Sequence, residues 1–379
     1  MKKTLIVTSV ASMIDQFNMP NIEVLKELNY EVHVAANFNC GSTSSAERKE
    51  EFKDELKNNN IPYHHVDFSR DLGSVILHLK AIKQLKSILH NNEYEFIHCQ
   101  SPIGGVITRV IGYFINTPVI YTAHGFHFFE GAPLKNWILF YPIEKLLANY
   151  TDVIITINKE DYKLAKDKFN SDRIEYIPGV GIDLERFKNV KVSKDKKCNE
   201  LNLPNESFNL LSVGELNKNK NHEVIIKALA KLNNPKLHYL ICGKGPLKEY
   251  LKEQARKLGV KENVHLLGFR RDIEEIYNIS NLFVFPSLRE GLSVALMEAM
   301  ASGLPVVCSN IRGNVDLIED EEGGYLIDPN NVHGFSEAIE KAYKNAEKRK
   351  KFGQRNLKYI KKHSKKEIKN ILYEIYDSV

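Results

Sequence analysis

Short runs of apolar residues recur along the chain, separated by longer segments in which apolar positions return every three or four residues. Such runs predict buried strands, and the periodic segments predict helices with one buried face. In the first half of the chain the predicted strands cover residues 4–8, 31–35, 62–66, 96–99, 118–122, 153–157 and 174–177. A second series covers residues 209–213, 237–242, 264–267, 282–285, 305–308 and 324–327. Strands that alternate with helices are typical of α/β proteins with parallel sheets covered on both faces.

A polar, turn-rich stretch from residue 178 to residue 207 separates the two series. A chain of 379 residues is long for one domain, so we expect two domains. The predicted organisation is a Rossmann-like domain over residues 1–185, a linker over 186–207 and a second Rossmann-like domain over 208–360. Residues 361–379 are predicted to form a helix whose apolar face carries Ile368, Ile371, Leu372, Ile375 and Tyr376.

The composition is that of an ordinary globular protein, with 43% apolar and 27% charged residues. No apolar run reaches the roughly 18 residues that a membrane-spanning helix needs, and the chain enters a strand at residue 4 without a secretory signal. We therefore expect a cytoplasmic protein. The five cysteines are odd in number and widely spaced, so they predict neither a metal site nor a disulfide framework.

Basic residues are concentrated at the carboxy-terminal end, where residues 343–379 hold 12 basic and 4 acidic side chains. Lysine-rich runs are most often solvated helix faces. The alternative is attraction to an anionic membrane surface, which would place the protein on the inner face of the cell membrane as a peripheral protein. Nucleic acid is not an expected partner, because the chain contains no nucleic-acid recognition motif.

Residues 131–150 contain the only tryptophan, Trp137, among more apolar side chains than one helix needs for packing. Ordinary packing beneath the sheet explains this pattern as well as a membrane-facing or lipid-receiving helix does. In the second case Lys135 and Lys145 would lie near lipid head groups.

The densest candidate chemistry lies between residues 282 and 310, where a strand, a loop, a helix over about 293–301 and a second strand follow one another. Glu290 is in the loop and Glu298 is in the helix, so at ~1.5 Å rise per residue they are roughly 10 Å apart. That separation suits the two ends of a nucleotide sugar. The backbone amides of Gly291, Leu292 and Ser293 begin the helix and would attract phosphate. Two surface glutamates are the common alternative, but Glu298 is the one charge in an otherwise apolar helix, which indicates burial.

The pattern Glu290-x7-Glu298 between the segments FVFPS and GLPVV resembles the signature of glycosyltransferase family 4, whose members are retaining enzymes of the GT-B fold. The segments VIYTAHGFHF, GELNKNKNH and NIRGNVDLI extend the resemblance over nearly the whole chain. The resemblance implies two Rossmann-like domains facing across a cleft, with a UDP-sugar as donor. Similarity is greatest to enzymes of bacterial capsule and exopolysaccharide biosynthesis.

The segment from Gly214 to Lys220 resembles the family motif Gly-Arg-Leu-x-x-x-Lys, which makes Lys220 the diphosphate lysine. A lysine there can neutralise the charge that builds up on the leaving nucleotide without a metal ion, whereas a surface lysine at a helix start is the structural alternative. The family's arginine is replaced by Glu215, so the diphosphate site loses one cation. Lys218 is a candidate to compensate for it.

Two further segments of the second domain are assigned to the nucleotide. Gly243 opens the turn Gly-Lys-Gly-Pro, which resembles the family turn that makes room for the nucleotide, although a simple turn explains it equally well. The resemblance places Phe269 and Arg270 beside the base, with uracil as the commonest base.

In the first domain, His124 matches the histidine that family members place beside the donor sugar and its β-phosphate. A neutral imidazole can donate a hydrogen bond to developing charge there. His127 could serve instead, and a packed structural histidine is the alternative for both. Ser12 and Asp15 lie in the loop after the first strand and are weaker candidates, because the family's Gly-Gly turn is missing. Arg109 could hold an acceptor phosphate or form a structural ion pair.

The expected reaction, as the resemblance implies it, transfers a hexose or N-acetylhexosamine from a UDP-sugar to a polyprenyl-linked or other glycan acceptor, with retention. The chain contains no Asp-x-Asp pair, so we expect no metal and no cofactor besides the donor. One alternative is a UDP-N-acetylglucosamine 2-epimerase, in which Glu215 would serve as an acid or base. Another is a non-catalytic nucleotide-sugar-binding partner of polysaccharide assembly.

Overall fold

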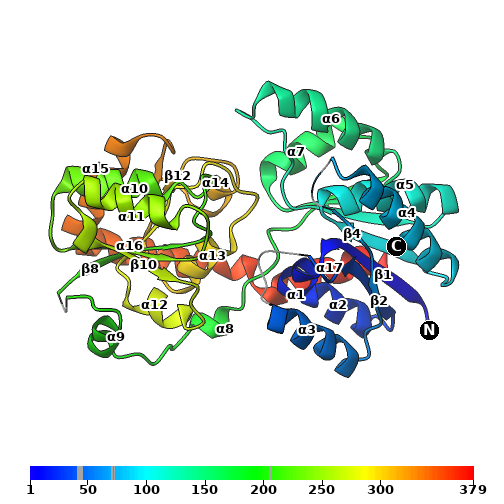
Figure 1. Cartoon of the computed structure of the whole chain (residues 1–379), viewed down its shortest axis with the longest axis horizontal. Helices are drawn as coiled ribbons and strands as arrows, with labels where there is room; N and C mark the ends of the chain where they lie inside the picture. The colour runs from blue at the N-terminus through cyan, green and yellow to red at the C-terminus, as the bar shows by residue number, and fades with distance from the viewer. Residues whose placement is uncertain (41–45, 70, 72, 205) are drawn as a thin grey trace. The chain divides into compact units, whose positions relative to one another are not determined.

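The computed structural model describes residues 1–40, 46–69, 71, 73–204 and 206–379. The chain divides into two compact units, one formed by residues 1–180 with 366–379 and the other by residues 181–365 (Figure 1). The first unit is built on a parallel sheet of seven strands, and the second unit on a parallel sheet of six strands. The two series of predicted strands are therefore confirmed, because buried parallel strands are short apolar runs that the sequence displays directly.

The sheet of the first unit has the order β3-β2-β1-β4-β5-β6-β7. Its strands are β1 (Lys3–Val10), β2 (Glu31–Asn37), β3 (Tyr63–His65), β4 (Phe96–Gln100), β5 (Val119–Ala123), β6 (Val153–Thr156) and β7 (Arg173–Tyr176). Its helices are α1 (Ala11–Phe17), α2 (Met19–Glu27), α3 (Ala46–Asn58), α4 (Val75–His90), α5 (Pro102–Ile115), α6 (Leu134–Ala148), α7 (Lys159–Lys168) and α17 (Lys365–Asp377).

Two hydrophobic cores fill the first unit, one on each face of its sheet. Helices α4, α5, α6 and α7 pack on one face, with Leu85, Ile111 and Ala148 among the buried contacts. Helices α1, α2, α3 and α17 pack on the other face (Figure 1). The last helix is fixed there by its apolar side and by Tyr376, whose hydroxyl group lies 2.7 Å from Nδ1 of His98.

The second sheet repeats the same order with β10-β9-β8-β11-β12-β13. Its strands are β8 (Phe208–Val213), β9 (Leu237–Cys242), β10 (Val264–Gly268), β11 (Leu282–Phe285), β12 (Val306–Ser309) and β13 (Gly324–Ile327). Its α-helices are α8 (Leu184–Phe187), α9 (Lys194–Glu200), α10 (His222–Leu232), α11 (Lys248–Lys257), α12 (Ile273–Ile279), α13 (Val294–Ala301), α14 (Asn314–Leu317), α15 (Val332–Lys344) and α16 (Ala346–Tyr359). The 3-10 turns are η1 (Lys261–Asn263) and η2 (Ile360–His363).

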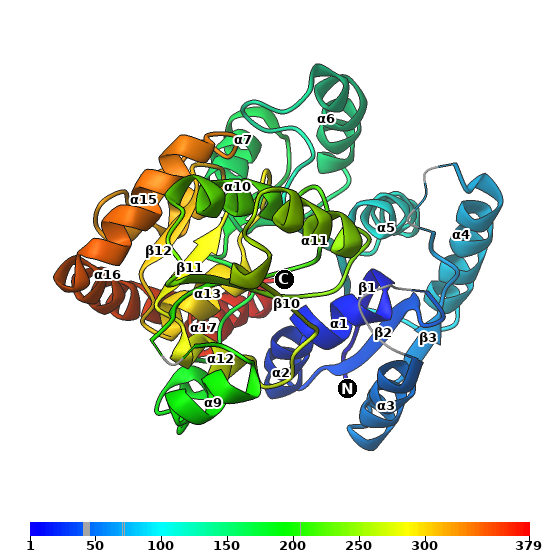
Figure 2. The same cartoon turned by 60° about the vertical axis from the view of Figure 1, so that its left-hand side comes forward.

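Helices α10, α11, α15 and α16 supply the main apolar core of the second unit (Figure 2). The stretch predicted as a linker lies in this same unit and contains the end of α8 and all of α9. Phe187, Cys198, Leu201 and Leu203 are the buried apolar side chains of this stretch. Four scattered apolar residues in a polar segment do not form a recognisable period, which is why the sequence indicated only a linker.

Candidate active site

The strand order of the second sheet reverses between β8 and β11. Consecutive strands run outward in one direction from β8 to β10 and in the other from β11 to β13. Loops at the carboxyl ends of β8 and β11 therefore diverge, and such a switch point is where open α/β sheets bind ligands. The loop after β8 carries Lys220 and the loop after β11 carries Glu290.

Lys220 and Glu290 meet at this switch point. Nζ of Lys220 lies 2.5 Å from Oε1 of Glu290, and the two side chains are 19% and 14% exposed. The same ammonium group lies 4.9 Å from the centre of the Phe285 ring. The structure thus brings together two of the three residues that the sequence predicts as catalytic, and holds them as a mostly buried ion pair.

Asparagine side chains fasten the two loops to each other. Asn219 donates from Nδ2 to the carbonyl oxygen of Arg289 at 3.0 Å, and its backbone carbonyl oxygen accepts from the amide of Leu288 at 2.8 Å. Asn221 takes the left-handed conformation at φ 51° and donates to the carbonyl oxygen of Pro286 at 3.2 Å. Asparagine tolerates that conformation better than most residues, so the Asn-rich sequence of this loop fixes the backbone on both sides of Lys220.

The helix α13 begins at Val294, shortly after the loop that carries Glu290, and has an open amino-terminal end. The Ser293 side chain caps it by accepting from the amide of Leu296 at 3.3 Å. Within the described part of the chain, the amides of Gly291, Leu292 and Ser293 donate to no protein acceptor. These groups therefore have no protein acceptor that an anionic ligand would have to displace, and their assignment to phosphate stays a prediction.

Arg312 was missed by the sequence interpretation, although it follows β12 on the same edge of the sheet. Its Nε donates to the carbonyl oxygen of Glu290 at 3.3 Å, and its side chain is largely buried. The next residue, Gly313, has φ 80°, and a Cβ atom there would lie 2.1 Å from the carbonyl oxygen of Gly291. Arg312 and Gly313 thus support the backbone around Glu290. The sequence signal that could have identified them is an arginine followed by a glycine shortly after a buried strand.

Glu298 lies in α13 and is held by a different neighbour. The Tyr277 hydroxyl group lies 3.1 Å from Oε2 of Glu298 and 3.0 Å from the carbonyl oxygen of Ala295. Burial raises the pKa of Glu298, while the hydrogen bond from Tyr277 and the positive charge of Arg186 oppose that rise. The partner that a buried carboxylate requires is therefore a fully buried tyrosine of α12.

Glycines let the loops after β8, β9 and β10 pack backbone to backbone. A Cβ atom on Gly243 would lie 1.8 Å from the carbonyl oxygen of Gly214, and the Gly243 amide donates to the carbonyl oxygen of Gly268 at 2.8 Å. A Cβ atom on Gly245 would lie 2.5 Å from the carbonyl oxygen of Leu216. The Gly-Lys-Gly-Pro turn is thus required by close packing at the sheet edge, whatever ligand it adjoins.

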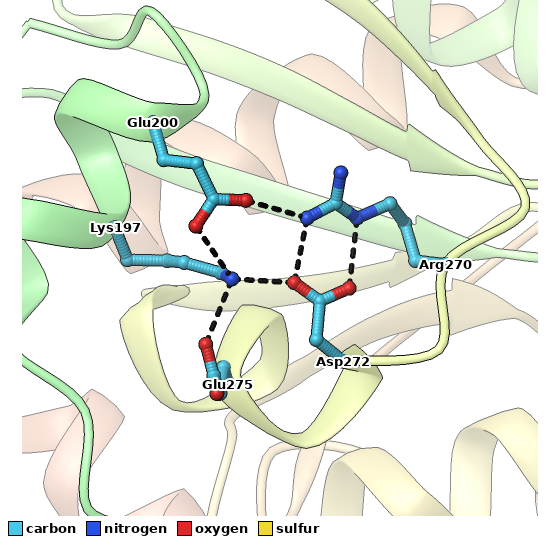
Figure 3. Close-up of polar contacts among 5 residues, drawn as sticks. All are labelled: Lys197, Glu200, Arg270, Asp272 and Glu275. Carbon is cyan, nitrogen blue, oxygen red and sulfur yellow. Dashed lines mark hydrogen bonds and ion pairs between the residues drawn. The ribbon is translucent and has the colours of Figure 1, made fainter.

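Phe269 and Arg270 follow β10 and have contrasting environments. The Phe269 side chain is 66% exposed. Arg270 pairs with Asp272 through Nε at 2.8 Å and with Glu200 of α9 through Nη2 at 2.8 Å. The guanidinium group therefore fastens the loop after β10 to α9, in a cluster that also contains Lys197 and Glu275 (Figure 3).

Lys197 is the centre of this cluster. Its ammonium group is buried and pairs with Glu200 at 2.9 Å, with Glu275 at 2.7 Å and with Asp272 (Figure 3). Burial alone would lower the pKa of Lys197, but the hydrogen bonds that its ammonium group donates to three carboxylates outweigh burial and raise it. The cluster joins α9 to the loop after β10, so it stabilises the region predicted to receive the base.

Glu215, the residue that departs from the family motif, is exposed and accepts from Nδ2 of Asn217 at 3.0 Å. Asn217 in turn accepts from the amide of Lys220 at 3.0 Å through Oδ1. Glu215 thus contributes to the turn that positions Lys220.

In the first unit, His124 follows β5 and borders a pocket. Residues from the sheet edge, α1, α2 and α17 line this pocket: Phe17, Asn21, Gln100, Thr122, His124, Ile155, Ile157, Ile177, Gly179, Val180, Ile368 and Leu372. Burial lowers the pKa of His124 to about 4, so the ring is neutral at physiological pH. His127 packs elsewhere, with its ring centre 4.7 Å from that of Phe140.

The proton of the neutral His124 ring is placed by Gln100. Nε2 of His124 lies 2.7 Å from Oε1 of Gln100, an atom that can only accept. The Gln100 amide is oriented by Asn18, since Asn18 Nδ2 donates to the same oxygen at 3.2 Å. Nε2 therefore carries the hydrogen, and Nδ1 is a hydrogen-bond acceptor.

The weaker candidates of the first unit have structural partners. Asp15 accepts from Nε of Arg48 at 3.0 Å, and Ser12 is buried. Arg109 is fully buried, pairs with Glu144 at 2.8 Å and lies 3.9 Å from the centre of the Tyr121 ring. Of the two alternatives for Arg109, the structure supports the structural ion pair.

Two features concern metals and membranes. Among the residues that the structure describes, no three His, Cys, Asp or Glu side chains are grouped so that they could hold a metal ion. Over the same residues, no helix combines the length and the apolar character that crossing a bilayer requires.

Two family models match the chain, one over each half. Residues 22–186 match the model described as Glycosyltransferase Family 4, and residues 193–359 match the model described as Glycosyl transferases group 1.

Relatives of known name align over most of the chain. The putative glycosyltransferase EpsD of Bacillus subtilis (strain 168) is 35% identical over 384 residues, which cover 100% of this chain and 97% of EpsD. The UDP-Gal:alpha-D-GlcNAc-diphosphoundecaprenol alpha-1,3-galactosyltransferase of Escherichia coli is 34% identical over 275 residues, covering 70% of each protein. The capsular polysaccharide biosynthesis glycosyltransferase CapM of Staphylococcus aureus is 24% identical and aligns with 89% of this chain and 87% of CapM.

Solved structures share the fold over the full length. Anabaena Alr3699/HepE, crystallised in complex with UDP-glucose, superimposes with a TM-score of 0.80 at 19% identity, covering 100% of both chains. WaaG, a glycosyltransferase involved in lipopolysaccharide biosynthesis, superimposes with a TM-score of 0.73 at 16% identity over 99% of both chains. The predicted fold class of two Rossmann-like parallel-sheet domains is thereby confirmed.

Proposed function

The chain belongs to glycosyltransferase family 4, and we propose that it transfers a hexose or N-acetylhexosamine from a UDP-sugar to a polyprenyl-linked acceptor with retention of configuration. The bond from the anomeric carbon to the acceptor oxygen forms as the bond to the diphosphate breaks. The acceptor proton passes to the leaving phosphate, so no separate general base is needed. The role is in capsule or exopolysaccharide biosynthesis, in keeping with the name of the relative CapM, a capsular polysaccharide biosynthesis glycosyltransferase.

One observation carries the proposal: the ion pair of Lys220 and Glu290 at the point where the strand order reverses. A diphosphate oxygen that replaces the Glu290 carboxylate as the partner of Lys220 would free Glu290 to accept hydrogen bonds from sugar hydroxyl groups. Donor binding would thus exchange one charge pair for another and leave neither charge unpaired, which avoids the cost of a buried single charge.

The position of this ion pair also determines which residues we assign to the other parts of the donor. We assign the free amides of Gly291, Leu292 and Ser293 to the diphosphate and the Glu298 carboxylate to the ribose hydroxyl groups. Phe269 and Arg270 adjoin the base, and Gly214 and Gly243 allow the close backbone turns beside the nucleotide. HepE, which shares the fold, was crystallised with UDP-glucose, and this supports a UDP-sugar as the donor here.

His124 is proposed to act on the donor sugar from the first unit. Because Nε2 donates its hydrogen to Gln100, the neutral ring would accept a hydrogen bond from a sugar hydroxyl group through Nδ1. The sequence suggested a donor role instead, and the difference follows from the orientation of the Gln100 amide.

Positive charge at the leaving diphosphate is proposed to come from Lys220 and the amides of α13 rather than from a divalent cation. The polyprenyl-linked acceptor is supported by the undecaprenol-linked substrate named for the Escherichia coli relative. Such an acceptor implies work at the inner face of the cell membrane, with the protein bound peripherally. The alternative 2-epimerase has no supporting observation, because Glu215 is exposed and bonded within its own turn.

The proposal is tested by incubating the purified protein with a panel of nucleotide sugars and following release of UDP, with and without EDTA. Release of UDP from one UDP-sugar, undiminished by EDTA and stimulated by a lipid-linked glycan, is expected. Interconversion of the sugar without release of UDP would indicate the epimerase. Binding of UDP with neither transfer nor hydrolysis would indicate a non-catalytic partner.

A further inference from the structure

Exposed apolar side chains are concentrated on three helices of the first unit. Among the described residues 21 large apolar side chains are exposed, and 12 of them belong to α4, α5 and α6. These 12 define what we call the apolar face: Val75, Ile76, Leu77, Leu79, Tyr113, Phe114, Ile115, Leu134, Ile138, Leu139, Ile143 and Leu146. Several are far more exposed than a scattered surface residue, with Ile76 at 82% and Phe114 at 76%.

The three helices lie side by side on one face of the first sheet. α5 packs between α4 and α6, and all three cover the core formed with the sheet (Figures 1 and 2). The orientation of α6 is fixed from below, since Glu144 on its inner side pairs with the buried Arg109 of α5. The outward side chains of α6 are consequently held at the surface of the first unit.

The exposed charged side chains on these three helices all have one sign. Helices α4 and α5 contain no aspartate or glutamate, and the single acidic residue of α6 is the buried Glu144. The exposed lysines on these helices are Lys80, Lys83, Lys86, Lys135 and Lys145. Lys80 pairs with Asp67 at 2.8 Å, whereas within the described residues the other four have no carboxylate partner. Acidic residues occur only in the loops at the helix ends, such as Glu93 and Glu130.

We propose that the apolar face is the surface by which the protein binds an anionic lipid bilayer. Its aliphatic side chains would enter the head-group region while the unpaired lysines lie at lipid phosphates. A surface of apolar side chains on helices whose exposed charged residues are all lysines fits that partner, because both burial and charge then favour the bilayer. The inference rests on the proposed lipid-linked acceptor for its purpose, and it goes further by naming the surface.

The basic tail fits this task less well, although its composition is more basic. Several of its cations already have acidic partners, including Lys348 with Glu321 at 3.0 Å and Arg355 with Glu319 at 3.0 Å. Large exposed apolar side chains are also sparse on α16 and α17, where Leu357 and Tyr373 are the two in the described chain. We therefore assign membrane contact to the apolar face rather than to residues 343–379.

The test is flotation of the purified full chain with vesicles of phosphatidylethanolamine and phosphatidylglycerol, compared with vesicles of phosphatidylcholine alone. Wild type should float with the anionic vesicles. Ile138→Gln with Leu139→Gln should lower the partition coefficient about tenfold or more, because two inserted aliphatic side chains are lost. Leu258→Gln, an exposed leucine at the end of α11 in the second unit, is the matched control and should bind as wild type does.

Two double variants, each lacking two lysines, distinguish binding by the apolar face from binding by the tail. Lys83→Gln with Lys86→Gln should weaken binding to the anionic vesicles about tenfold and reduce its sensitivity to salt, because each lysine at the surface contributes to the attraction. Lys350→Gln with Lys351→Gln on α16 should leave binding unchanged. Equal losses from both pairs, or a loss only from the tail pair, would overturn the assignment.

Two further readouts keep the outcome unambiguous. Light scattering without vesicles should show a monomer, and a dimer that Ile138→Gln with Leu139→Gln dissociates would mean that a second copy covers the apolar face, which overturns the proposal. Calorimetric titration with UDP should give the same affinity for wild type and for all four variants. A wild type that binds UDP but not vesicles refutes the docking surface alone, whereas a wild type that binds vesicles but not UDP refutes the proposed donor site alone.

Discussion

The hydroxyl group of Tyr277 in α12 lies 3.1 Å from the buried carboxylate of Glu298 in α13. This contact joins two helices on the same side of the second sheet and supplies the carboxylate with a hydrogen-bond donor. Because burial already raises the pKa of Glu298, the tyrosine helps to keep the group ionised and able to accept from hydroxyl groups of a ligand.

We predict that Tyr277→Phe weakens donor binding in a pH-dependent way. Without the tyrosine hydroxyl the pKa of Glu298 rises further, so the carboxylate is protonated at a higher pH as the solution is acidified. At alkaline pH the variant should bind UDP with the affinity of wild type. As the pH is lowered, the variant should lose affinity at a higher pH than wild type does. Calorimetric titrations with UDP across the pH range measure this, and parallel curves for both proteins would rule out a role for Glu298 at the ribose.

Gln100→Glu should change the ionisation of His124. Burial holds the pKa of His124 at about 4, and a carboxylate 2.7 Å from Nε2 would raise it by favouring the imidazolium. In wild type the ring is neutral across the physiological range, so its Nδ1 stays an acceptor. In the variant both nitrogens carry hydrogen below the raised pKa, and turnover should fall there.

The measurement is the pH profile of kcat/KM, together with the NMR titration of the His124 ring. The variant should acquire an ionisation on the acidic side of the profile that wild type lacks above about pH 5. His127→Gln serves as the control for the neighbouring ring and should leave the profile unchanged. A normal profile for Gln100→Glu despite a raised ring pKa would exclude an acceptor role for Nδ1.

Lys197→Met should destabilise the second unit, because it removes the cation that pairs with Glu275 and leaves Glu200 and Asp272 to Arg270 alone (Figure 3). Removing one partner from a buried charge cluster costs on the order of 2–4 kcal/mol, the lower values applying here because the carboxylates reach solvent. Lys196→Met changes an exposed neighbour in the same helix and should be neutral within about 0.5 kcal/mol. Urea denaturation of the full chain measures both. Equal midpoints for the two variants would mean that the cluster contributes nothing.

Gly243→Ala should disrupt the sheet edge, because the new Cβ atom would lie 1.8 Å from the carbonyl oxygen of Gly214. Neither backbone can withdraw without breaking ladder hydrogen bonds, so a loss of more than about 3 kcal/mol is expected. Gly259→Ala is the control, since its φ of 73° is strained for alanine but its Cβ position is open, and about 1 kcal/mol is expected. A variant at Gly243 as stable as the control would show that the loops can separate.

Much of the candidate active site in the second unit could be predicted from the sequence, because its residues directly follow strands. The apolar runs before Gly214 and Pro286 place both following loops at one sheet edge, and the apolar helix around Glu298 indicates a buried carboxylate. The contacts that complete the site join segments distant in sequence. Tyr277 with Glu298, and Arg312 with the carbonyl oxygen of Glu290, are pairings that no local pattern specifies.

In the first unit, too, the features that the sequence left open depend on contacts between residues distant in sequence. Arg109 and Glu144 are 35 residues apart, so their ion pair could not be distinguished from a phosphate-binding arginine. The residues of the apolar face come from three helices, and each helix alone shows only a few surplus apolar side chains. A surface of this kind is visible only when the packing of the helices is known.

Lys220, paired with Glu290 in the free protein, is proposed to supply the positive charge for the donor diphosphate. The most direct measurement is calorimetric titration with UDP, in EDTA, of wild type, of Lys220→Met and of Lys231→Met, an exposed lysine at the end of α10. Loss of a charge-assisted bond to the diphosphate should weaken UDP binding by roughly tenfold to a hundredfold in Lys220→Met and leave Lys231→Met at the wild-type affinity. Equal affinity of all three proteins for UDP, or wild-type binding that disappears in EDTA, would contradict the claim.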